Sequence, residues 1–540
     1  MFQKYLNTWS LIPLLCFIFF ISPVVVVISS LFGDYSDNWI HLYDYVLGTY
    51  IKNSIYLVSG VLVLVTFIGV STAWLITNYN FFLKNLLEWA LILPLAVPPY
   101  ILAYTFTGLF DTYGTANNLI RDIFNLSRDF TFFPKVRNVP GAIIVFSFTL
   151  YPYVYLVSRM AFINQSKSIL EAGRTLGLNK LQVFYKLAVP MIRPAIIGGL
   201  MLVAMETLSD FGAVDHFAIS TFTTGIFRTW YGMYDINTAK QLSSLLLIIA
   251  IMFILGEKYS RRNADYSFAG SVFKQVYLVK LRGFKSLLAF VFCFLPIFIG
   301  FILPIIELSY WALNYKLDFF NEKFVTTAWN SFYLAIISAL LCTCLAIFIN
   351  FSVRYKKNNV LKFLSSFLTV GYAVPGIILA IGVMQLLTFI DSRIIGENIQ
   401  FILTGSLIGL IIAYIIKSYA LASSTIDSGY QRVNMRLDDV AKTLKTSGWS
   451  LLSSVHLPLL KTSFLTSVLL VISEVIKELP ATLILRPFNF DTLAVYTYIF
   501  AAEERMYDAA APSIAIVMIG LLPIIILTRM IRTSRPASRD

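Results

Sequence analysis

Charged residues are scarce in this sequence. Only 13% of its 540 residues are Asp, Glu, Lys or Arg, whereas 58% are hydrophobic. A soluble domain usually carries about 25% charged residues. Together with a mean hydropathy of +0.76, this composition excludes a soluble globular protein.

Cysteine and histidine are also rare. All cysteines lie inside apolar runs, so we expect neither a disulfide framework nor a zinc site, and we expect Cys342 and Cys344 to be small core residues. The histidines are scattered among predicted loops and are expected to be solvated or hydrogen-bonded rather than metal ligands. The residues concerned are Cys16, Cys293, Cys342, Cys344, His41, His216 and His456.

Two signatures of enzymes are missing. The chain has no Gly-x-x-x-x-Gly-Lys-Ser/Thr phosphate loop, and no polar stretch is long enough for a nucleotide-binding domain. No Ser/His/Asp arrangement suggests catalysis either. The chain is therefore predicted not to be an enzyme and to bind no cofactor, and any ATP that drives it must be hydrolysed by a partner.

Long apolar runs, in contrast, recur along the whole chain. Each is long enough to cross a bilayer as a helix. They lie near 11–31, 54–77, 88–110, 141–163, 192–212, 242–256, 284–309, 331–353, 361–390, 401–424, 464–486 and 510–528. The sequence thus predicts an all-α membrane protein with roughly twelve transmembrane helices, and the first run is interpreted as a retained helix rather than a cleaved signal peptide.

The basic residues follow the predicted topology. If the N-terminus is cytoplasmic, the cytoplasmic segments hold 27 Lys and Arg against 7 Asp and Glu, and the rest holds 15 against 22. These segments are 1–10, 79–87, 164–193, 257–285, 354–362, 425–461 and 529–540. The bias favours cytoplasmic N- and C-termini. It also accounts for the net charge of +13 without any nucleic-acid partner.

The two halves of the chain repeat each other. Asn53-Ser54-Ile55-Tyr56-Leu57 recurs as Asn330-Ser331-Phe332-Tyr333-Leu334, and Val97-Pro98 recurs as Val374-Pro375. Further along, Thr175-Leu176 matches Thr443-Leu444. We therefore predict two pseudo-symmetric six-helix halves, 1–256 and 284–540, joined by a cytoplasmic linker at 257–283. Six spans per half give a parallel repeat, which places a pathway between the halves.

A motif follows the fourth predicted span of each half. The first copy reads Glu171-Ala172-Gly173-Arg174-Thr175-Leu176-Gly177 and continues to Pro190; the second contains Asp439-Val440-Ala441 and ends at Pro458. The stretch 168–177 is predicted to form a short surface helix that Gly177 ends in a left-handed conformation. A plain amphipathic loop helix is the alternative, but two copies at equivalent positions argue against it.

This motif resembles the EAA loop of permease subunits in ABC importers. The resemblance implies that Glu171, Ala172 and Gly177 form a coupling helix that docks on an ATPase subunit, and that Gly173, Pro190 and the second copy (Asp439, Val440, Ala441 and Pro458) belong to the same contact. The second copy departs from the pattern, with Asp439 in place of Glu and Lys445 in place of Gly. It is expected to couple more weakly or with a different shape.

Acidic residues recur in the fifth span of each half. Glu206 and Asp210 are four residues apart, as are Glu474 and Glu478, so each pair is predicted to share one helix face. Carboxylates at membrane depth usually face a cavity, a partner or a pathway, and with Tyr151 and Tyr153 they offer oxygen ligands to hard cations. In the alternative, the acids lie at the outer helix ends, exposed or paired with a residue such as Lys477.

The surrounding segments are similar to the ferric-iron group of these permeases. They read ETLSDFGAV at 206–214, TFTTGIFRTWYG at 221–232, ELPATLILRP at 478–487 and FDTL at 490–493. The resemblance implies a bacterial inner-membrane permease that moves Fe3+, with an extracytoplasmic ferric-binding protein and an ATPase dimer as partners. An importer of the same kind that carries thiamine or a phosphonate instead of Fe3+ is an alternative. A secondary transporter, for which broken helices are more typical, is a further alternative.

Overall fold

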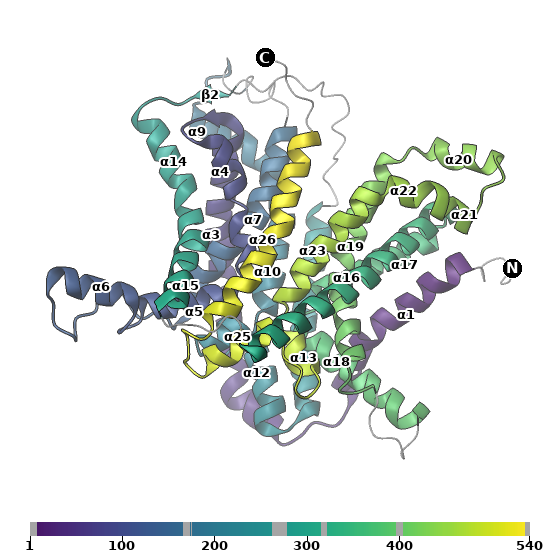
Figure 1. Ribbon diagram of the computed structural model, residues 1–540, viewed down its shortest axis with the longest axis horizontal. Helices are drawn as coiled ribbons and strands as arrows, with labels where there is room; N and C mark the ends of the chain where they lie inside the picture. The colour runs from purple at the N-terminus through teal and green to yellow at the C-terminus, as the bar shows by residue number, and fades with distance from the viewer. Residues whose placement is uncertain are drawn as a thin grey trace.

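A computed structural model describes residues 8–165, 173, 175–261, 278–314, 321–395 and 403–534 (Figure 1). Within these ranges the chain is almost entirely helical. The single strand pair is parallel and joins β1 (Tyr79–Asn80) to β2 (Val279–Lys280). The predicted all-α class is confirmed.

The elements follow the two sequence halves; labels with η mark short 3-10 or π turns. Those of the first half are α1 Thr8–Ser29, η2 Ser30–Phe32, α2 Asn38–His41, η3 Leu42–Val46, α3 Leu47–Asn78, α4 Lys84–Ala90, η4 Leu93–Ala96, α5 Pro99–Phe110, α6 Thr115–Phe124, α7 Val139–Asn164, α9 Lys180–Val183, η5 Phe184–Ala188, α10 Val189–Ser209, α11 Gly212–His216, α12 Phe222–Phe227, η6 Arg228–Gly232 and α13 Ile236–Arg261.

The second half repeats this order with its own turns. Its elements are α14 Phe284–Ile297, η7 Phe298–Ile302, α15 Leu303–Asn314, α16 Glu322–Lys356, α17 Asn359–Leu368, η8 Thr369–Ala373, α18 Gly376–Ile390, η9 Asp391–Ile395, α19 Leu407–Arg432, α20 Met435–Thr443, α21 Trp449–Leu451, η10 Leu452–His456, α22 Leu457–Leu459, α23 Lys461–Lys477, α24 Pro480–Leu485, α25 Leu493–Ala502 and α26 Ala510–Ser534.

The membrane spans agree with the predicted number. In the described part of the chain, nine helices are long and apolar enough to cross a membrane, or up to eleven if each bent pair is one span; α26 contains a further apolar helix, Ala510–Ile526. The predicted run 88–110 is wrong as a straight span, because the helices on either side of Val97-Pro98 meet at 92°. Proline lacks an N–H donor and disfavours helix in the residue before it, which explains the break.

Three long helices form the centre of each half. In the first half α3, α7 and α10 pack against one another, and in the second half α16, α19 and α23 do the same. Close approach at the α3–α7 contact depends on Gly69, since a Cβ atom there would lie 3.0 Å from the backbone nitrogen of Tyr155. Small residues at such contacts are typical of helices that associate in a membrane.

The repeated Asn-Ser pairs make equivalent hydrogen bonds in the two halves. The Asn53 side chain donates to the Ser220 carbonyl (3.0 Å), and that of Asn330 donates to the Asp491 carbonyl (3.2 Å). In the second half the Ser331 hydroxyl then accepts from the first N–H of α25 (2.7 Å). The repeat seen in the sequence is therefore a repeat of structure, in which these pairs lie at the start of a short helix, α12 or α25.

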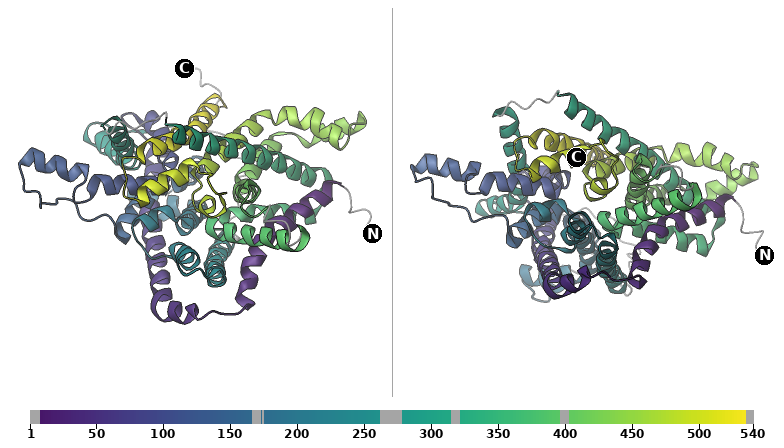
Figure 2. Two further views of the ribbon diagram at one scale, coloured as in Figure 1. Left: turned by 60° about the horizontal axis from the view of Figure 1, so that its bottom comes forward. Right: turned by 90° about the horizontal axis from the view of Figure 1, so that it is seen from below.

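The first helices of the halves are exchanged. Helix α1 packs against α16, α17 and α18 of the second half, while α14 packs against α3 and α4 of the first half; Figure 2 shows α1 beside the green helices. Trp9 stacks on Phe348 and contacts Trp449, each with ring centroids 5.0 Å apart. The predicted boundaries at 256 and 284 thus separate sequence repeats whose helices interlock in space.

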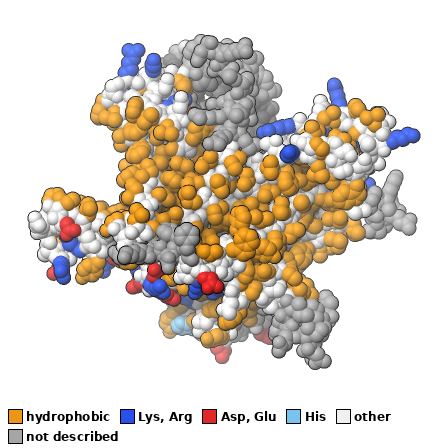
Figure 3. Space-filling model, viewed as in Figure 1, with side chains coloured by type: hydrophobic (Ala, Val, Ile, Leu, Met, Phe, Trp, Pro, Cys, Tyr) orange, Lys and Arg blue, Asp and Glu red, His pale blue; other side chains and the backbone are white. Residues whose placement is uncertain are grey.

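Charge and apolar surface are segregated. Figure 3 shows a broad hydrophobic band across the middle of the molecule, Lys and Arg at the upper ends of its two arms, and Asp and Glu near its lower edge. The cysteines are free: Cys293 and Cys342 are buried, but Cys344 is exposed. The expectation of a core position was wrong for Cys344, because apolar surface on the outside of a membrane protein faces lipid rather than a core.

Candidate functional site

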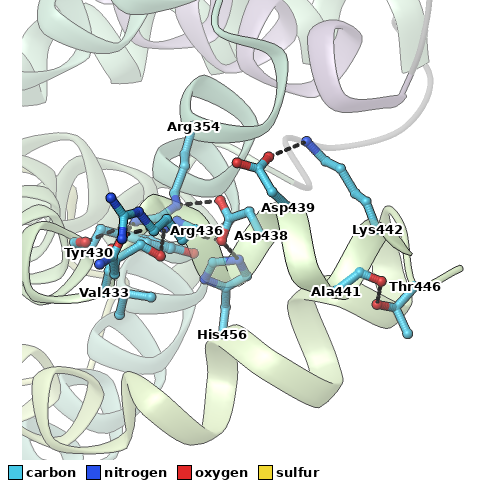
Figure 4. Close-up of polar contacts among 11 residues, drawn as sticks. Arg354, Tyr430, Val433, Arg436, Asp438, Asp439, Ala441, Lys442, Thr446 and His456 are labelled. Atoms are coloured by element: carbon cyan, nitrogen blue, oxygen red, sulfur yellow. Dashed lines mark hydrogen bonds and ion pairs between the residues drawn. The ribbon is translucent and has the colours of Figure 1, made fainter. Parts of the chain in front are cut away.

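The second copy of the loop motif lies in α20, a short helix whose polar contacts are drawn in Figure 4. Its exposed face carries Asp439 and Val440, whereas Ala441 is buried against the body of the protein. Figure 1 places α20–α22 and α9 at the same end of the molecule, opposite to α12 and α25. The loop motifs of both halves are therefore presented on one face.

An arginine from the long helix α16 fixes the start of α20. Arg354 binds Asp438 with Nε 2.8 Å from Oδ2 and Nη2 3.1 Å from Oδ1. Its Nη1 also donates to the carbonyls of Tyr430 (2.9 Å) and Val433 (3.0 Å), where α19 ends. One planar guanidinium thus holds three helices together, and bidentate pairing gives this contact a fixed geometry.

His456 lies beneath the same ion pair. Its ring is fully buried, and neither ring nitrogen makes a hydrogen bond, although Nε2 is 3.2 Å from Asp438 Oδ1. Burial lowers the pKa of His456, while the Asp438 carboxylate acts in the opposite direction. His456 is therefore paired with a carboxylate rather than solvated, and the packing of η10 under α20 that brings the two together could not be inferred from a loop sequence.

Both copies of the motif end in the same turn. Gly177 has φ +85° and Lys445 has φ +61°. In each copy the next N–H bonds a carbonyl five residues back, Leu178 to Gly173 at 3.1 Å and Thr446 to Ala441 at 3.0 Å. Lys445 therefore keeps the left-handed conformation that glycine normally supplies, and the departure from the family pattern changes the residue without changing the turn.

Lys445→Gly is expected to stabilise the end of α20 by about 1 kcal/mol, because a left-handed conformation costs a non-glycine residue roughly 1–2 kcal/mol. Hydrogen–deuterium exchange of α20 in the purified protein measures this as slower opening. Lys442→Gly, placed inside the helix, is the matched control and should speed exchange. Faster exchange in Lys445→Gly would contradict the explanation.

The first copy is only partly described. Glu171 and Ala172 lie outside the described residues. Gly173 is buried, and a Cβ atom there would lie 2.4 Å from Leu187 Cδ1, so no larger side chain fits without movement. Pro190 stands in the first turn of α10. Pro458 lies in α22, which meets α23 at a bend of 77°.

One apolar side chain stands out at equivalent positions of the two motifs. Leu176 is 84% exposed and Leu444 is 73% exposed. Neither leucine is therefore part of the protein's own core.

A cavity of about 90 Å³ lies at the centre of the molecule, between the two halves. Its wall is formed by the segments where helices are interrupted, which follow η4, α10 and α23. Its lining includes Leu95, Tyr100, Tyr153, Glu206, Asp210, Lys417, Glu474, Lys477 and Glu478. The four carboxylates singled out in the sequence therefore come together, two from each half.

Two polar contacts cross between the halves at this cavity. The Tyr372 hydroxyl donates to Glu206 Oε1 (2.6 Å), and Lys477 Nζ donates to the Leu95 carbonyl (3.3 Å). Lys477 Nζ also lies 3.8 Å from Glu474 Oε2. Tyr372 and Leu95 occupy equivalent positions of the repeat, so each half uses the same position, through a different group, to contact the other half.

Asp210 and Glu478 were predicted to lie on helix faces, and this is wrong. Both lie just beyond a helix end. Both have extended backbone after the last residue of α10 and α23. Asp210 Oδ1 accepts from the Ala213 N–H (2.9 Å), and Glu478 Oε1 accepts from the Ala481 N–H (3.2 Å). Each carboxylate therefore caps the short helix that follows, α11 or α24, which explains why the spans end there.

A buried cation balances part of this negative charge. Lys417 Nζ forms an ion pair with Glu478, and the side chains of both are about nine-tenths buried. The pairing was missed in the sequence, although a lysine inside the apolar run 401–424 is itself a signal of an intramembrane partner. Arg354 and Tyr372 carried no comparable signal, since neither their spacing nor their surroundings indicated a contact.

The two predicted tyrosines have different surroundings. Tyr153 lines the central cavity. Tyr151 does not; it is fully buried in α7, and its hydroxyl makes no hydrogen bond. Because the two residues are two apart on a helix, they point in different directions.

The sequence matches a known family in two places. The family of binding-protein-dependent transport system inner membrane components matches residues 65–256 and, separately, residues 342–539. The chain belongs to this family. One match lies within each half, and each contains one copy of the loop motif and two of the cavity carboxylates, so the permease joins two family units in one multi-pass inner-membrane chain.

The permease is similar to several named transport proteins. It is 26% identical to the Fe(3+)-transport system permease protein FbpB 2 of Haemophilus influenzae, over 86% of each chain. It is 23% identical to the ferric transport system permease protein FbpB of Actinobacillus pleuropneumoniae, over 95% of this chain and 76% of that one. The molybdenum transport system permease protein ModB of H. influenzae is 26% identical but matches only 35% of the permease.

Proposed function

We propose that the permease carries Fe3+ across the bacterial inner membrane, receiving it from an extracytoplasmic ferric-binding protein and powered by a separate ATPase dimer. The ferric permeases to which it is similar cover most of its length, whereas ModB matches only one segment of it. The N- and C-termini are proposed to be cytoplasmic, on the side of the two loop motifs.

The observation that carries the substrate class is the chemistry of the central cavity. Four carboxylates and the phenols of Tyr153 and Tyr372 converge there from the two halves. Ionised carboxylate and phenol oxygens are hard ligands that suit a hard cation such as Fe3+. Both Tyr372–Glu206 and Lys477–Leu95 would have to separate when the halves rock apart, so the cavity is placed to open alternately to each side.

The size of the cavity argues against an organic substrate. A volume of about 90 Å³ holds several water molecules, since one needs roughly 10–15 Å³ of such space. An ion with part of its hydration shell fits, whereas a two-ring cation such as thiamine would require the halves to separate first.

The ATPase contact is proposed to involve Leu176 and Leu444 together with the motif residues Glu171, Ala172, Asp439 and Val440. An exposed leucine at equivalent positions provides each docking surface with an apolar anchor. Leu176→Asp with Leu444→Asp should prevent assembly with the ATPase, because each Asp would bury a charge in the contact. Co-purification measures this; Phe488→Asp, an exposed apolar residue at the other end of the molecule, should leave the complex intact.

Uptake of radioactive Fe3+ into vesicles containing the permease, its ATPase and its binding protein tests the function. Uptake that requires ATP is expected. ATP hydrolysis stimulated by the binding protein without iron uptake would redirect the substrate to thiamine or a phosphonate. Uptake independent of ATP would favour a secondary transporter.

The carboxylate pathway has its own test in the same vesicles. Glu206→Gln with Glu474→Gln is expected to lower iron uptake at least about tenfold, because two charged ligands become neutral, while ATPase stimulation by the binding protein persists. Glu503→Gln, on the exposed end of α25, is the control and should not change uptake. Full uptake in the double variant would remove the pathway assignment.

A further inference from the structure

A second cavity lies between the halves, at the end of the molecule opposite to the coupling loops. It has a volume of about 140 Å³, and its polar lining consists of Tyr104, Arg137, Asp215, His216, Tyr498 and Glu504. Arg137 lies two residues before the first residue of α7, and the first coupling loop follows that helix. Since α7 has 26 residues, its ends are about 39 Å apart, which places the cavity at the extracytoplasmic face in the proposed orientation.

A hydrogen bond between two oxygen ligands, one from each half, lines this cavity. The Tyr498 hydroxyl, from α25, donates to Asp215 Oδ2, from α11, at 2.9 Å. Adjacent ligands of an octahedral ion at about 2.0–2.1 Å are separated by about 2.9 Å. A hard cation could therefore replace the shared proton with little movement of either side chain, and the phenol proton would pass to water.

A third oxygen in the cavity has no partner. The Tyr104 hydroxyl is buried and makes no hydrogen bond. Its ring packs on His216 at 4.7 Å between centroids, and His216 Nε2 is held 2.9 Å from Thr107 Oγ1. A buried hydroxyl without a partner costs free energy, so a ligand that binds it would recover that cost.

The charges around the cavity favour a cation. Arg137 is compensated by Glu504, with Nη1 3.0 Å from Oε1, and lies 4.0 Å from Asp111. In the described part of the chain, no Lys or Arg pairs with Asp215. No three Asp, Glu, His or Cys side chains of the described residues group together as a metal site, so the site depends on the phenol oxygens, which suit a trivalent hard ion.

The outer and central cavities are connected by two short helices. Tyr104 lines the outer cavity and Tyr100, one turn earlier on α5, lines the central one; their rings are 5.8 Å apart and both hydroxyls lack hydrogen bonds. Helix α11 likewise presents Gly212 to the central cavity and Asp215 to the outer one. A series of oxygen ligands thus leads from one cavity to the other.

We propose that Asp215 and Tyr498, with the buried hydroxyl of Tyr104, form a receiving site for Fe3+ at the extracytoplasmic mouth of the permease. The site holds the ion after release from the binding protein and before it reaches Glu206 and Glu474. Helix α11 belongs to the first half and α25 to the second, so each half contributes ligands to the site. This proposal rests on Fe3+ being the substrate.

The test is the visible charge-transfer band that a phenolate–Fe3+ bond produces. Purified full-length permease in lipid nanodiscs, titrated with Fe3+ supplied as its nitrilotriacetate chelate, should develop this band. Tyr498→Phe should abolish it and Asp215→Asn should weaken ion binding at least about tenfold. Tyr113→Phe, a 74% exposed tyrosine in the same external region, and the double variant Glu206→Gln, Glu474→Gln should keep the band.

The outcomes separate this site from the transport function. No band in a permease that takes up iron with ATP would remove the receiving site and leave the function standing. A band that persists in both Tyr498→Phe and Asp215→Asn would assign it to other tyrosines and overturn the proposal. If the permease shows no band and takes up no iron, Fe3+ is overturned as the substrate as well. Binding of each variant to the ATPase shows that it is folded.

Discussion

Arg354→Ala is expected to detach α20, the proposed second coupling helix. The arginine and its partner Asp438 are about nine-tenths buried, and removing one member of a buried ion pair costs about 3–5 kcal/mol because the other charge remains without compensation. The variant also loses the hydrogen bonds to the carbonyls that end α19. We expect the permease to remain in the membrane but to lose most binding-protein-stimulated ATP hydrolysis.

A matched control lies nearby. Arg432, near the end of α19, is exposed, so Arg432→Ala removes the same charge from the same face and should change stimulated hydrolysis little. Arg354→Lys keeps the charge but not the bidentate geometry, and an intermediate value is expected. Normal stimulated hydrolysis in Arg354→Ala, with a normal amount of assembled complex, would show that α20 needs no anchor for coupling.

Lys417→Met is expected to have an effect of similar size at the central cavity. It leaves Glu478 buried without its cation, next to Glu206 and Glu474 in the same cavity, for a cost of about 3–5 kcal/mol. The permease should melt at a clearly lower temperature in nanodiscs, and iron uptake should fall because the second half's side of the central cavity is destabilised.

A double variant distinguishes the ion pair from the lysine as such. Lys417→Met with Glu478→Gln removes both charges, and replacing a buried pair by neutral groups is often close to neutral for stability. Glu478→Gln retains an oxygen that can cap α24. The melting temperature should therefore recover in the double variant. A double variant as unstable as Lys417→Met would refute the pairing as the source of the effect.

The sequence by itself determined the spans, the repeat and the two loop motifs. Each depends on local properties: about 20 apolar residues cross a bilayer, basic residues mark one side, and a left-handed residue ends a helix. The set of carboxylates was also visible, because charge inside an apolar run is costly anywhere in a membrane. Hence Glu206, Asp210, Glu474 and Glu478 could be singled out without knowing their partners.

Only the tertiary structure decided which partners these residues have. The ion pairs of Arg354 with Asp438 and of Lys417 with Glu478 join segments far apart in the chain. So does the exchange of α1 and α14 between the halves. Lipid tails are as apolar as the helix faces, so burying an apolar face against another helix gains no hydrophobic free energy. Packing and buried hydrogen bonds, rather than hydropathy, therefore select the neighbours of each helix.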